Sequence, residues 1–257
     1  MMETRTFRAY KTLYEVQGNP SDAYFKALPD HDLGGLANFL SRIIKTRHVK
    51  TCLDIGANIG LASLIMAELA PASKIMSFEP SPRTFDHLSA NIGRNHGWAQ
   101  ISPQPFAVGS ESKTIKFFFD DNMSHANHIV IDGSGTDVEM KSIDDFVYGA
   151  ALDSVDFMKV DVEGFELQVF QGALQTILKH RPTIIFEFNE YAIVENAKLD
   201  PVDCLRGIIE FVGPLAVVNP ANGEATPLPA GANAAISALR SMMRSGDDIF
   251  DLVNQVA

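Results

Sequence analysis

Short apolar runs alternate with amphipathic segments along most of this chain, and this alternation limits the possible folds more than any other feature. The amphipathic segments repeat apolar residues every three or four positions, which is typical of helices that cover a core with one face. Strands that alternate with helices favour an α/β fold, in which a mostly parallel sheet has helices on both faces. The runs that we expect to form the core strands are KTCLDI, KIMSFE, AQISPQPFAV, SVDFMKV and RPTIIFEF.

Between these strands the sequence predicts helices and one hairpin. We expect helices at 33–46 and 59–70, and a third that begins at Ser81 and Pro82, an N-cap residue followed by a proline in the first turn. KTIKFFF and TDVEMKSI predict a hairpin around the polar loop at 120–135. A helix after SVDFMKV has apolar residues at helical spacing, namely Leu167, Phe170, Leu174, Ile177 and Leu178.

The two ends of the sequence carry fewer signals than the middle. Residues 1–32 are the least regular, and we predict that they form a cap segment on a single domain that spans 33–257. After residue 200 we expect a helix, the short strand LAVVN, a Pro/Gly loop at 220–231, another helix and an apolar stretch at 249–256. This last region contains no motif that indicates a reaction.

Net charge and apolar content exclude several classes of partner. The formal net charge is -11 and the sequence pI is about 5.0, so the surface repels phosphate, and we expect no nucleic-acid partner. The first residues lack the apolar core of a signal peptide, and no apolar run approaches the roughly 18 residues of a membrane span. Cys52 and Cys204 match no zinc or redox spacing, which indicates buried reduced thiols. We therefore predict a cytoplasmic protein that acts on a small molecule away from membranes; the sequence does not indicate its oligomeric state.

The segment LDIGANIG joins the first predicted strand to a helix. Gly56 and Gly60 flank Asn58 in it, and glycine allows a sharp turn and the close approach of a ligand to the backbone. Dinucleotide-binding turns have the spacing G-x-G-x-x-G, whereas this turn reads G-x-N-x-G. The turn suits S-adenosylmethionine better, because its ammonium group needs an acidic neighbour such as Asp54. A tight turn without any ligand is the simpler alternative.

The second predicted strand ends in SFEP, which places Glu79 at its carboxyl end. A carboxylate at this position, about 20 residues after the glycine turn, accepts hydrogen bonds from both ribose hydroxyls of a bound nucleoside. The turn and Glu79 together favour an adenosine-containing ligand. A 2′-phosphate is disfavoured, because Glu79 would repel it.

Several segments also occur in the order found in one known family. They are CLDIGANIGLASL, FEPSPRTFDHLSANI, FAVG, KSIDDF, VDFMKVDVEGFELQVFQGA and TIIFEFNE. On these segments the chain resembles the FkbM family of S-adenosylmethionine-dependent methyltransferases. The resemblance covers roughly residues 50–190, and the pairing of FEP with KVDVEGFE is its most specific part.

The resemblance implies a class I methyltransferase fold, with a seven-stranded, mostly parallel sheet and helices on both sides. It also implies methyl transfer to a hydroxyl group of a sugar, a polyketide or another natural product. The loop NMSHANHIVI at 122–131 departs from the family, so the acceptor cannot be carried over. By position, the resemblance assigns Asp54, Gly56, Asn58 and Gly60 to the methionine end of the cofactor, Glu79 to the ribose, Phe106 and Ala107 to the adenine, and Asp161 to the methionine and the reaction centre.

The charged residues of KVDVEGFE are the candidate catalytic groups. Asp161 follows the fourth core strand, at the sheet edge where ligands bind in such folds. An alcohol that accepts a methyl group loses a proton, so Asp161 or Glu163 could act as the base, which typically contributes ~10²- to 10⁴-fold. Lys159 shares a strand face with Asp161 and could keep it ionised, or could act as a base itself with a depressed pKa. The structural alternative is that Asp161 caps the next helix, while Glu163 and Glu166 compensate its dipole.

Four further polar residues are candidates for binding the acceptor. Glu187 and Asn189 end the fifth core strand and face the same edge of the sheet; a turn or capping role is the alternative. His125 and His128 lie in the polar loop, where a substrate contact or a role as base is possible. We predict no metal site, because the two histidines lack a third ligand nearby, although Asp161 and Glu187 leave Mg²⁺ open.

The preferred interpretation is an S-adenosylmethionine-dependent O-methyltransferase. Its nearest alternative is N-methylation, which requires a neutral amine and a different pH profile. A non-catalytic module that binds the cofactor is a second alternative. A nicotinamide oxidoreductase is a third, and the missing glycine spacing argues against it.

Overall fold

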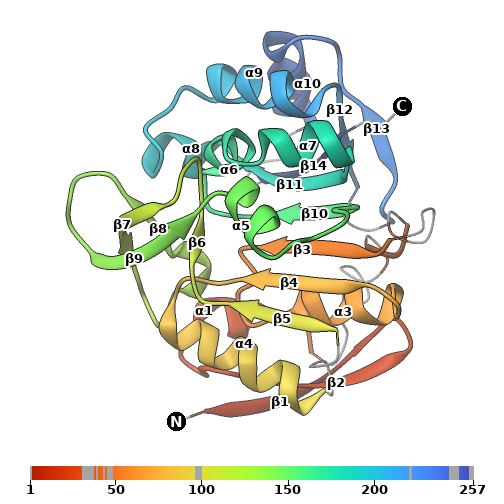
Figure 1. The fold of residues 1–257 in the computed structure, drawn as a ribbon, viewed down its shortest axis with the longest axis vertical. Coiled ribbons are helices and arrows are strands. Elements are labelled where there is room, and N and C mark those ends of the chain that lie inside the picture. Colours follow the sequence, from red (N-terminus) through yellow and green to blue (C-terminus); the bar gives the residue numbers. More distant parts are fainter. Residues whose placement is uncertain are drawn as a thin grey trace.

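A computed structural model describes residues 2–30, 38, 40–42, 44, 49–95, 100–219, 222–242 and 249–254. Its centre is an eight-stranded sheet (Figure 1). The strands lie in the order β13 (Ala225–Pro227), β12 (Leu215–Val218), β14 (Ile249–Asn254), β11 (Thr183–Asn189), β10 (Phe157–Val160), β3 (Thr51–Ile55), β4 (Lys74–Phe78) and β5 (Ile101–Gln104).

The strands from β11 to β5 are parallel, whereas β12, β13 and β14 pair antiparallel. The prediction of a mostly parallel α/β sheet is therefore confirmed. The predicted number of seven strands is too low by one. The additional strand is the short edge strand β13, which forms inside the predicted Pro/Gly loop by pairing with β12.

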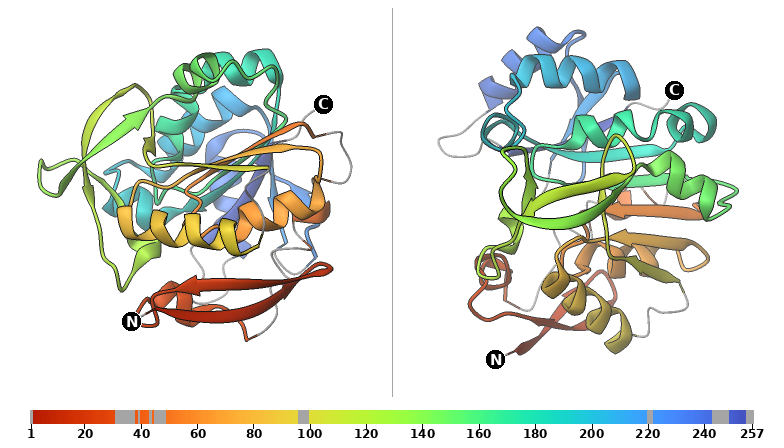
Figure 2. Two further views of the ribbon diagram at one scale, coloured as in Figure 1. Left: turned by 60° about the horizontal axis from the view of Figure 1, so that its bottom comes forward. Right: turned by 60° about the vertical axis from the view of Figure 1, so that its left-hand side comes forward.

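Helices cover both faces of this sheet (Figure 2). One face carries α3 (Leu61–Leu69) and α4 (Pro82–Arg94), whose apolar stripes form one core with the sheet. Ser81 caps α4 as predicted, because its side chain accepts a hydrogen bond from Thr84 N. The other face carries α5 (Ile143–Gly149), α6 (Glu166–Gln171), α7 (Leu174–His180), α8 (Glu190–Glu195), α9 (Pro201–Val212) and α10 (Ala232–Met242), which share a second core.

A smaller four-stranded sheet lies beside the central one, in the order β6 (Ala107–Val108), β9 (Thr136–Lys141), β7 (Lys113–Phe118) and β8 (His128–Val130). The antiparallel pairing of β7 with β9 confirms the predicted hairpin. Its connecting loop is partly structured, since it contains β8 and the short 3-10 helix η2 (Ser124–Ala126).

Two predicted elements are divided in the structure. The third core strand, expected as one run, ends at Gln104, and β6 joins the smaller sheet instead. Pro105 has no N–H with which to continue the ladder, and this explains the break. The helix expected after β10 is split into α6 and α7 at Gly172. A Cβ on Gly172 would lie 2.0 Å from Gly109 O, so the close approach of these two backbones requires glycine here.

The segment 2–30, expected to be the least regular part of the chain, contains regular secondary structure. It contains the hairpin of β1 (Glu3–Ala9) and β2 (Thr12–Gly18), followed by α1 (Ala23–Ala27). Phe7 and Val16 are fully buried in the core shared with α3 and α4. Asn91 on α4 accepts a hydrogen bond from Gln17 N (2.6 Å) and donates one to Gln17 O (3.0 Å). The hairpin is thus attached to the main body of the protein by apolar packing and by a buried amide.

The predicted helix at 33–46 falls mostly outside the described residues. The division into 1–32 and 33–257 stays a prediction. In the described part of the chain, every helix is too short or too polar to cross a bilayer.

Candidate functional site

A cavity of about 850 Å³ opens at the carboxyl ends of β3, β4, β10 and β11. This is the edge of a parallel sheet where ligands are expected to bind. Two groups of residues define its ends. The turn end consists of Gly56, Asn58, Glu79, Phe106 and Ala107, and the acidic end consists of Glu163, Glu187, Asn189 and Asp251, with Lys159 and Asp161 between them.

The glycine turn follows β3 directly and forms one wall of the turn end. Gly56 has φ +79°, and a Cβ on it would lie 1.7 Å from Asp161 O, so only glycine fits. Asn58 also has a positive φ of 47° and lines the cavity, and its contact with the cofactor stays a prediction. Gly60 is absent from the wall. It caps α3 with φ +93° and packs against Leu88, which gives it a structural reason to be glycine.

Glu79 lies at the carboxyl end of β4 and is only 6% exposed. Its carboxylate accepts hydrogen bonds from Asn58 N (3.1 Å) and Ser81 N (2.9 Å). Burial raises the pKa of Glu79 to about 7, although the two backbone amides oppose this shift. A carboxylate has about four acceptor positions. Its oxygens can therefore still accept hydrogen bonds from hydroxyl groups of a ligand.

Asp54 has a different place from the one expected. It is fully buried beneath the cavity and is absent from its wall. Its Oδ2 accepts a hydrogen bond from Ser63 Oγ (2.5 Å), and its Oδ1 lies 3.9 Å from Lys159 Nζ. Burial raises the pKa of Asp54, while Lys159 and Ser63 oppose this shift. Asp54 therefore acts on the cavity through Lys159 rather than by direct contact.

Lys159 joins Asp54 to Asp161. Its Nζ donates to Asp161 Oδ2 at 3.0 Å, and its side chain is 17% exposed. Burial opposes the charge on Lys159, but the two carboxylates outweigh this effect and raise its pKa. This shift is opposite in direction to the depressed pKa that a base at Lys159 would need.

Carboxyl groups from three elements meet at the acidic end. Glu187 on β11 lies opposite Asp251 on β14 in an antiparallel pair, so both side chains are on the same sheet face. Burial and neighbouring carboxylates raise the pKa of Glu187 to about 10, of Glu163 to about 9 and of Asp251 to about 6. At neutral pH, Glu163 and Glu187 are therefore protonated and can donate hydrogen bonds to a ligand.

Glu163 and Glu166 were both candidates for stabilising the helix dipole from the first turn of the next helix. Only Glu166 lies in that turn. Glu163 precedes α6, in a turn where its φ is +55°, so it does not lie in the first helical turn. Glu166 does lie there, and its Oε1 accepts hydrogen bonds from Val162 N and Gly164 N. The structural role thus belongs to Glu166, whereas Glu163 faces the cavity.

Asp161, Glu163 and Glu187 each offer a carboxylate oxygen within 4.8 Å of the others. Oxygen ligands at this spacing are compatible with a divalent cation. Mutual repulsion between carboxylates is equally relieved by protonation, in line with the raised pKa values of Glu163 and Glu187.

The remaining predicted residues divide between the wall and its surroundings. Phe106 and Ala107 line the turn end, where the ring of Phe106 packs at a tilt against the rings of Phe78 and Phe146. Asn189 lines the acidic end and also caps α8 by accepting a hydrogen bond from Ala192 N, so its capping role is confirmed, whereas its role in acceptor binding stays a prediction. His125 lines the cavity, whereas His128 packs on Phe118 outside the wall.

The sequence did not indicate several residues of the wall. Tyr24 reaches the cavity from α1, Ser124 from η2, and Ile249 and Asp251 from β14. A single phenol, hydroxyl or carboxylate far from any motif carries no signal of its own. The pairing of β14 with β11 would have been needed to place Asp251 opposite Glu187.

Comparison with known proteins assigns the chain to a family. The family profile described as Methyltransferase FkbM domain matches residues 54–205, which is more than half of the chain. The chain belongs to the FkbM methyltransferase family. This confirms the resemblance inferred from the sequence motifs, and residues 54–205 contain the whole turn end and Asp161, Glu163, Glu187 and Asn189 of the cavity wall.

Two relatives and one solved structure show how far the similarity extends. Hexuronic acid methyltransferase AglP of Haloferax volcanii is 30% identical over 161 residues, which are 61% of this chain and 60% of the relative. The 2-O-methyltransferase NoeI of Sinorhizobium fredii is 26% identical over 158 residues, which are 54% and 62% of the two proteins. The match thus spans about 60% of the length of these curated relatives.

A candidate O-methyltransferase from Klebsiella pneumoniae has a crystal structure with a TM-score of 0.50 to this chain, at 14% identity, and the match covers 93% of this chain and 91% of that one. At this level of identity the comparison shows the fold alone. Together with the family assignment, it confirms the class I methyltransferase fold predicted from the sequence.

Proposed function

We propose that this FkbM-family protein is an S-adenosylmethionine-dependent O-methyltransferase that acts on a hydroxyl group of a small molecule. The observation that carries the proposal is a single cavity that joins a buried ribose-type carboxylate, Glu79, to the strand-end carboxylate Asp161. Membership of the family and the relatives AglP and NoeI, which are named for sugar-type and O-methyl chemistry, support it.

The turn end fits the cofactor. The backbone at Gly56 leaves a surface that a Cβ would fill, and buried Glu79 has acceptor positions for ribose hydroxyls. Phe106 and Ala107 offer apolar contacts for a base beside them. S-adenosylmethionine supplies an electrophilic methyl group there: the acceptor oxygen bonds to the methyl carbon while the carbon–sulfur bond breaks and leaves its electron pair on sulfur.

Asp161 is the residue that we propose takes the proton from the acceptor. It lies at the junction of the two ends, and Lys159 fixes its carboxylate through a 3.0 Å hydrogen bond. Glu163 is a weaker candidate for the base, because its raised pKa of about 9 keeps it protonated at neutral pH. Glu163 and Glu187 instead orient acceptor hydroxyls by donating hydrogen bonds.

The charge of the acidic end limits the acceptor. Glu163 and Glu187 are protonated there near pH 7, but Asp251, whose pKa is about 6, is mostly ionised. Lys159, a cation in the described part of the wall, is already paired with Asp161 and Asp54. An acceptor with its own carboxylate would meet repulsion here. We therefore propose an uncharged polyhydroxyl acceptor, in contrast to the hexuronic acid for which AglP is named.

Calorimetric titration of the protein with S-adenosylhomocysteine, with NAD as the control, tests the cofactor. We expect binding of S-adenosylhomocysteine alone, and its loss in Glu79→Ala. Failure of the wild-type protein to bind S-adenosylhomocysteine at millimolar concentration would contradict the proposal.

A panel of methyl glycosides with labelled S-adenosylmethionine tests the acceptor. We expect a neutral glucoside or fucoside to be methylated on oxygen, and the matching glucuronide to react at least about tenfold more slowly because of the acidic wall. Methylation of the amine of a glucosaminide, with a rate that rises with pH, would favour N-methylation instead. Cofactor binding without any turnover across the panel would favour a binding module. The cytoplasmic location and the absence of a nucleic-acid partner stay predictions from the sequence.

A further inference from the structure

Tyr24 belongs to the cavity although it lies outside the family-matched residues 54–205. It sits on α1, where its side chain is partly buried against the core of the hairpin, α3 and α4. The influences on its hydroxyl group are burial and the charges of nearby residues, and no hydrogen bond to a described residue is among them. A phenol that reaches a cavity with a free hydroxyl group is available to bind a ligand.

Hydrogen bonds fix α1 across the glycine turn. Asp22 caps the helix, and its carboxylate also accepts from Ser124 N (2.9 Å) and Ser124 Oγ (2.6 Å). Ser124 Oγ in turn accepts from Asn58 Nδ2 at 3.3 Å. This chain from Asp22 through Ser124 to Asn58 places Tyr24 above the turn that we assign to the methionine end of the cofactor.

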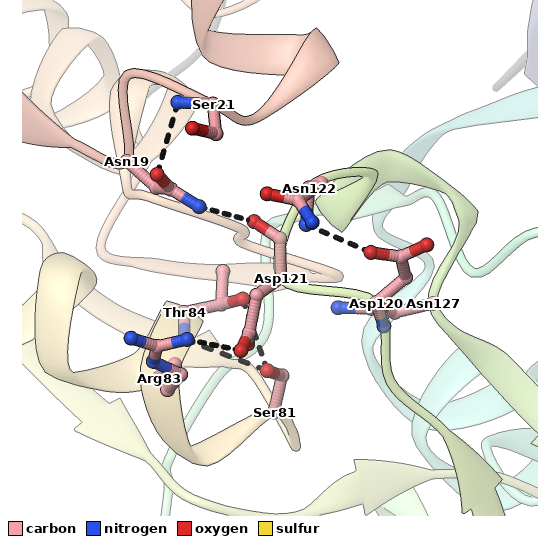
Figure 3. Close-up of polar contacts among 9 residues, drawn as sticks. All are labelled: Asn19, Ser21, Ser81, Arg83, Thr84, Asp120, Asp121, Asn122 and Asn127. Carbon is pink, nitrogen blue, oxygen red and sulfur yellow. Dashed lines mark hydrogen bonds and ion pairs between the residues drawn. The ribbon is translucent and has the colours of Figure 1, made fainter.

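A second set of contacts attaches the N-terminal segment to the residues after β7, and these in turn to the start of α4. Figure 3 shows Asp121 between Asn19 of the N-terminal segment and Arg83 at the start of α4. Asn19 Nδ2 donates to Asp121 O at 2.6 Å, and the Asp121 carboxylate forms an ion pair with Arg83. Ala23 N also donates to Asn122 O at 2.7 Å. Tyr24 is therefore carried by a segment that is attached on two sides.

The charged residues near Tyr24 are suited to bind an amino-acid group, which has both a carboxylate and an ammonium group. Burial raises the pKa of Tyr24 to about 12; Lys159 opposes the shift, and Asp161 and Asp54 add to it. The phenol is therefore neutral near pH 7 and can donate a hydrogen bond. A carboxylate bound here would be met by the donors Tyr24 and Lys159, and an ammonium group by Asp161.

We propose that the Tyr24 hydroxyl group binds the carboxylate of the cofactor's amino-acid end, so that the N-terminal segment completes the cofactor pocket. The inference rests on the proposed function. It adds a binding residue from a part of the chain that the family profile does not cover.

Calorimetry with two probes tests this inference. S-adenosylhomocysteine has the amino-acid end, whereas 5′-methylthioadenosine lacks it and keeps the adenosine and the sulfur. We expect Tyr24→Phe to weaken S-adenosylhomocysteine binding roughly tenfold, as for a hydrogen bond to a charged group, and to change 5′-methylthioadenosine binding less than about twofold. Tyr148→Phe is the matched control, because Tyr148 is 90% exposed and lies outside the cavity; it should change neither.

The other outcomes are distinct. If Tyr24→Phe weakens the binding of both probes equally, Tyr24 only supports the structure of the N-terminal segment, and the inference is overturned. Unchanged binding of both probes would overturn it as well. If the wild-type protein binds neither probe, the proposed function fails instead. Equal melting temperatures of Tyr24→Phe and the wild-type protein without ligand would confirm that the fold is unaffected.

Discussion

Backbone hydrogen bonds hold the turn end of the cavity, whereas the acidic end has carboxyl groups that repel one another. Glu79 accepts from two main-chain amides, and Gly56 is packed against the backbone at Asp161. Glu163, Glu187 and Asp251 have no comparable partners among the described residues, and the pKa of each is raised. The turn end is therefore rigid before a ligand arrives, while the acidic end limits the repulsion among its carboxyl groups by taking up protons.

The two ends also differ in where their residues come from. The glycine turn and Glu79 lie within 26 residues of one another, on adjacent parallel strands. The acidic end combines the turn after β10 with β11 and with β14, which is separated from β11 by α8, α9 and α10. The glycine turn and Glu79 thus form one local motif, whereas the proposed acceptor site depends on tertiary pairing and can change without disturbing that motif.

The largest effect on stability is expected at the turn end. Gly56→Ala forces a Cβ to within 1.7 Å of Asp161 O at a positive φ, so we expect the free energy of unfolding to fall by at least about 3 kcal/mol. Urea denaturation measures this change. Gly149→Ala is the control, because its Cβ meets nothing within 4 Å, and it should leave stability unchanged or raise it slightly. Wild-type stability in Gly56→Ala would contradict the rigid turn.

A substitution of Lys159, which lies between the two ends of the cavity, should have an intermediate effect on stability. Lys159→Met leaves buried Asp54 without its cation, and we expect a loss of about 2–3 kcal/mol at pH 8. The loss should be smaller at pH 5, where Asp54 can take up a proton, because burial already raises its pKa. Urea denaturation at the two pH values checks this. Lys116→Met removes an exposed pair with Asp137 and should cost less than about 0.5 kcal/mol; an equal loss in both variants would argue against a special role for Lys159.

The smallest effect on stability is expected at the acidic end. There the substitution should stabilise the protein instead of destabilising it. The pKa of Glu187 is about 10 in the folded protein, far above its ordinary value, so the folded state binds this proton more tightly than the unfolded state. Its contribution to stability is therefore full in acid and is lost as the pH rises from about 4.5 towards 10. We expect Glu187→Gln to be more stable than the wild-type protein by roughly 1 kcal/mol at pH 9, with little difference at pH 4.5.

Thermal unfolding at both pH values measures this gain. Glu210→Gln, on the exposed side of α9, is the matched control and should show no such dependence on pH. A Glu187→Gln protein that is less stable than the wild-type protein at pH 9 would mean that the carboxylate has a cationic partner in solution, such as a metal ion held with Asp161 and Glu163.

The turn end could be predicted from the sequence because local chemistry fixes it. Gly56 and Asn58 occupy a turn that few other residues tolerate, and Glu79 ends a strand at a set distance from that turn. Even there, Asp54 proved to lie under the cavity instead of in its wall, because β3 is buried along its whole length and its sequence does not show which face each side chain takes. The fold class followed from the alternation of strands and helices for the same local reason.

The acidic end and the N-terminal segment could not be predicted in this way. Asp251 depends on the register of β14 against β11, and Tyr24 depends on hydrogen bonds between Asp22 and Ser124, residues 102 positions apart. The hairpin of β1 and β2 was missed because charged and polar residues occupy most of its outer face, and only a few buried side chains mark the inner one. Contacts of this kind have no periodic signature in a single sequence.

The position of β14 has a consequence for the order in which the protein is made. This strand lies inside the sheet, between β11 and β12, yet the ribosome produces it after every other described strand. Until β14 emerges, β12 and β13 have no route to the parallel strands, and the wall at Ile249 and Asp251 is missing. A nascent chain can therefore form the glycine turn and Glu79 early, but it can complete the proposed acceptor site only after β14 has been synthesised.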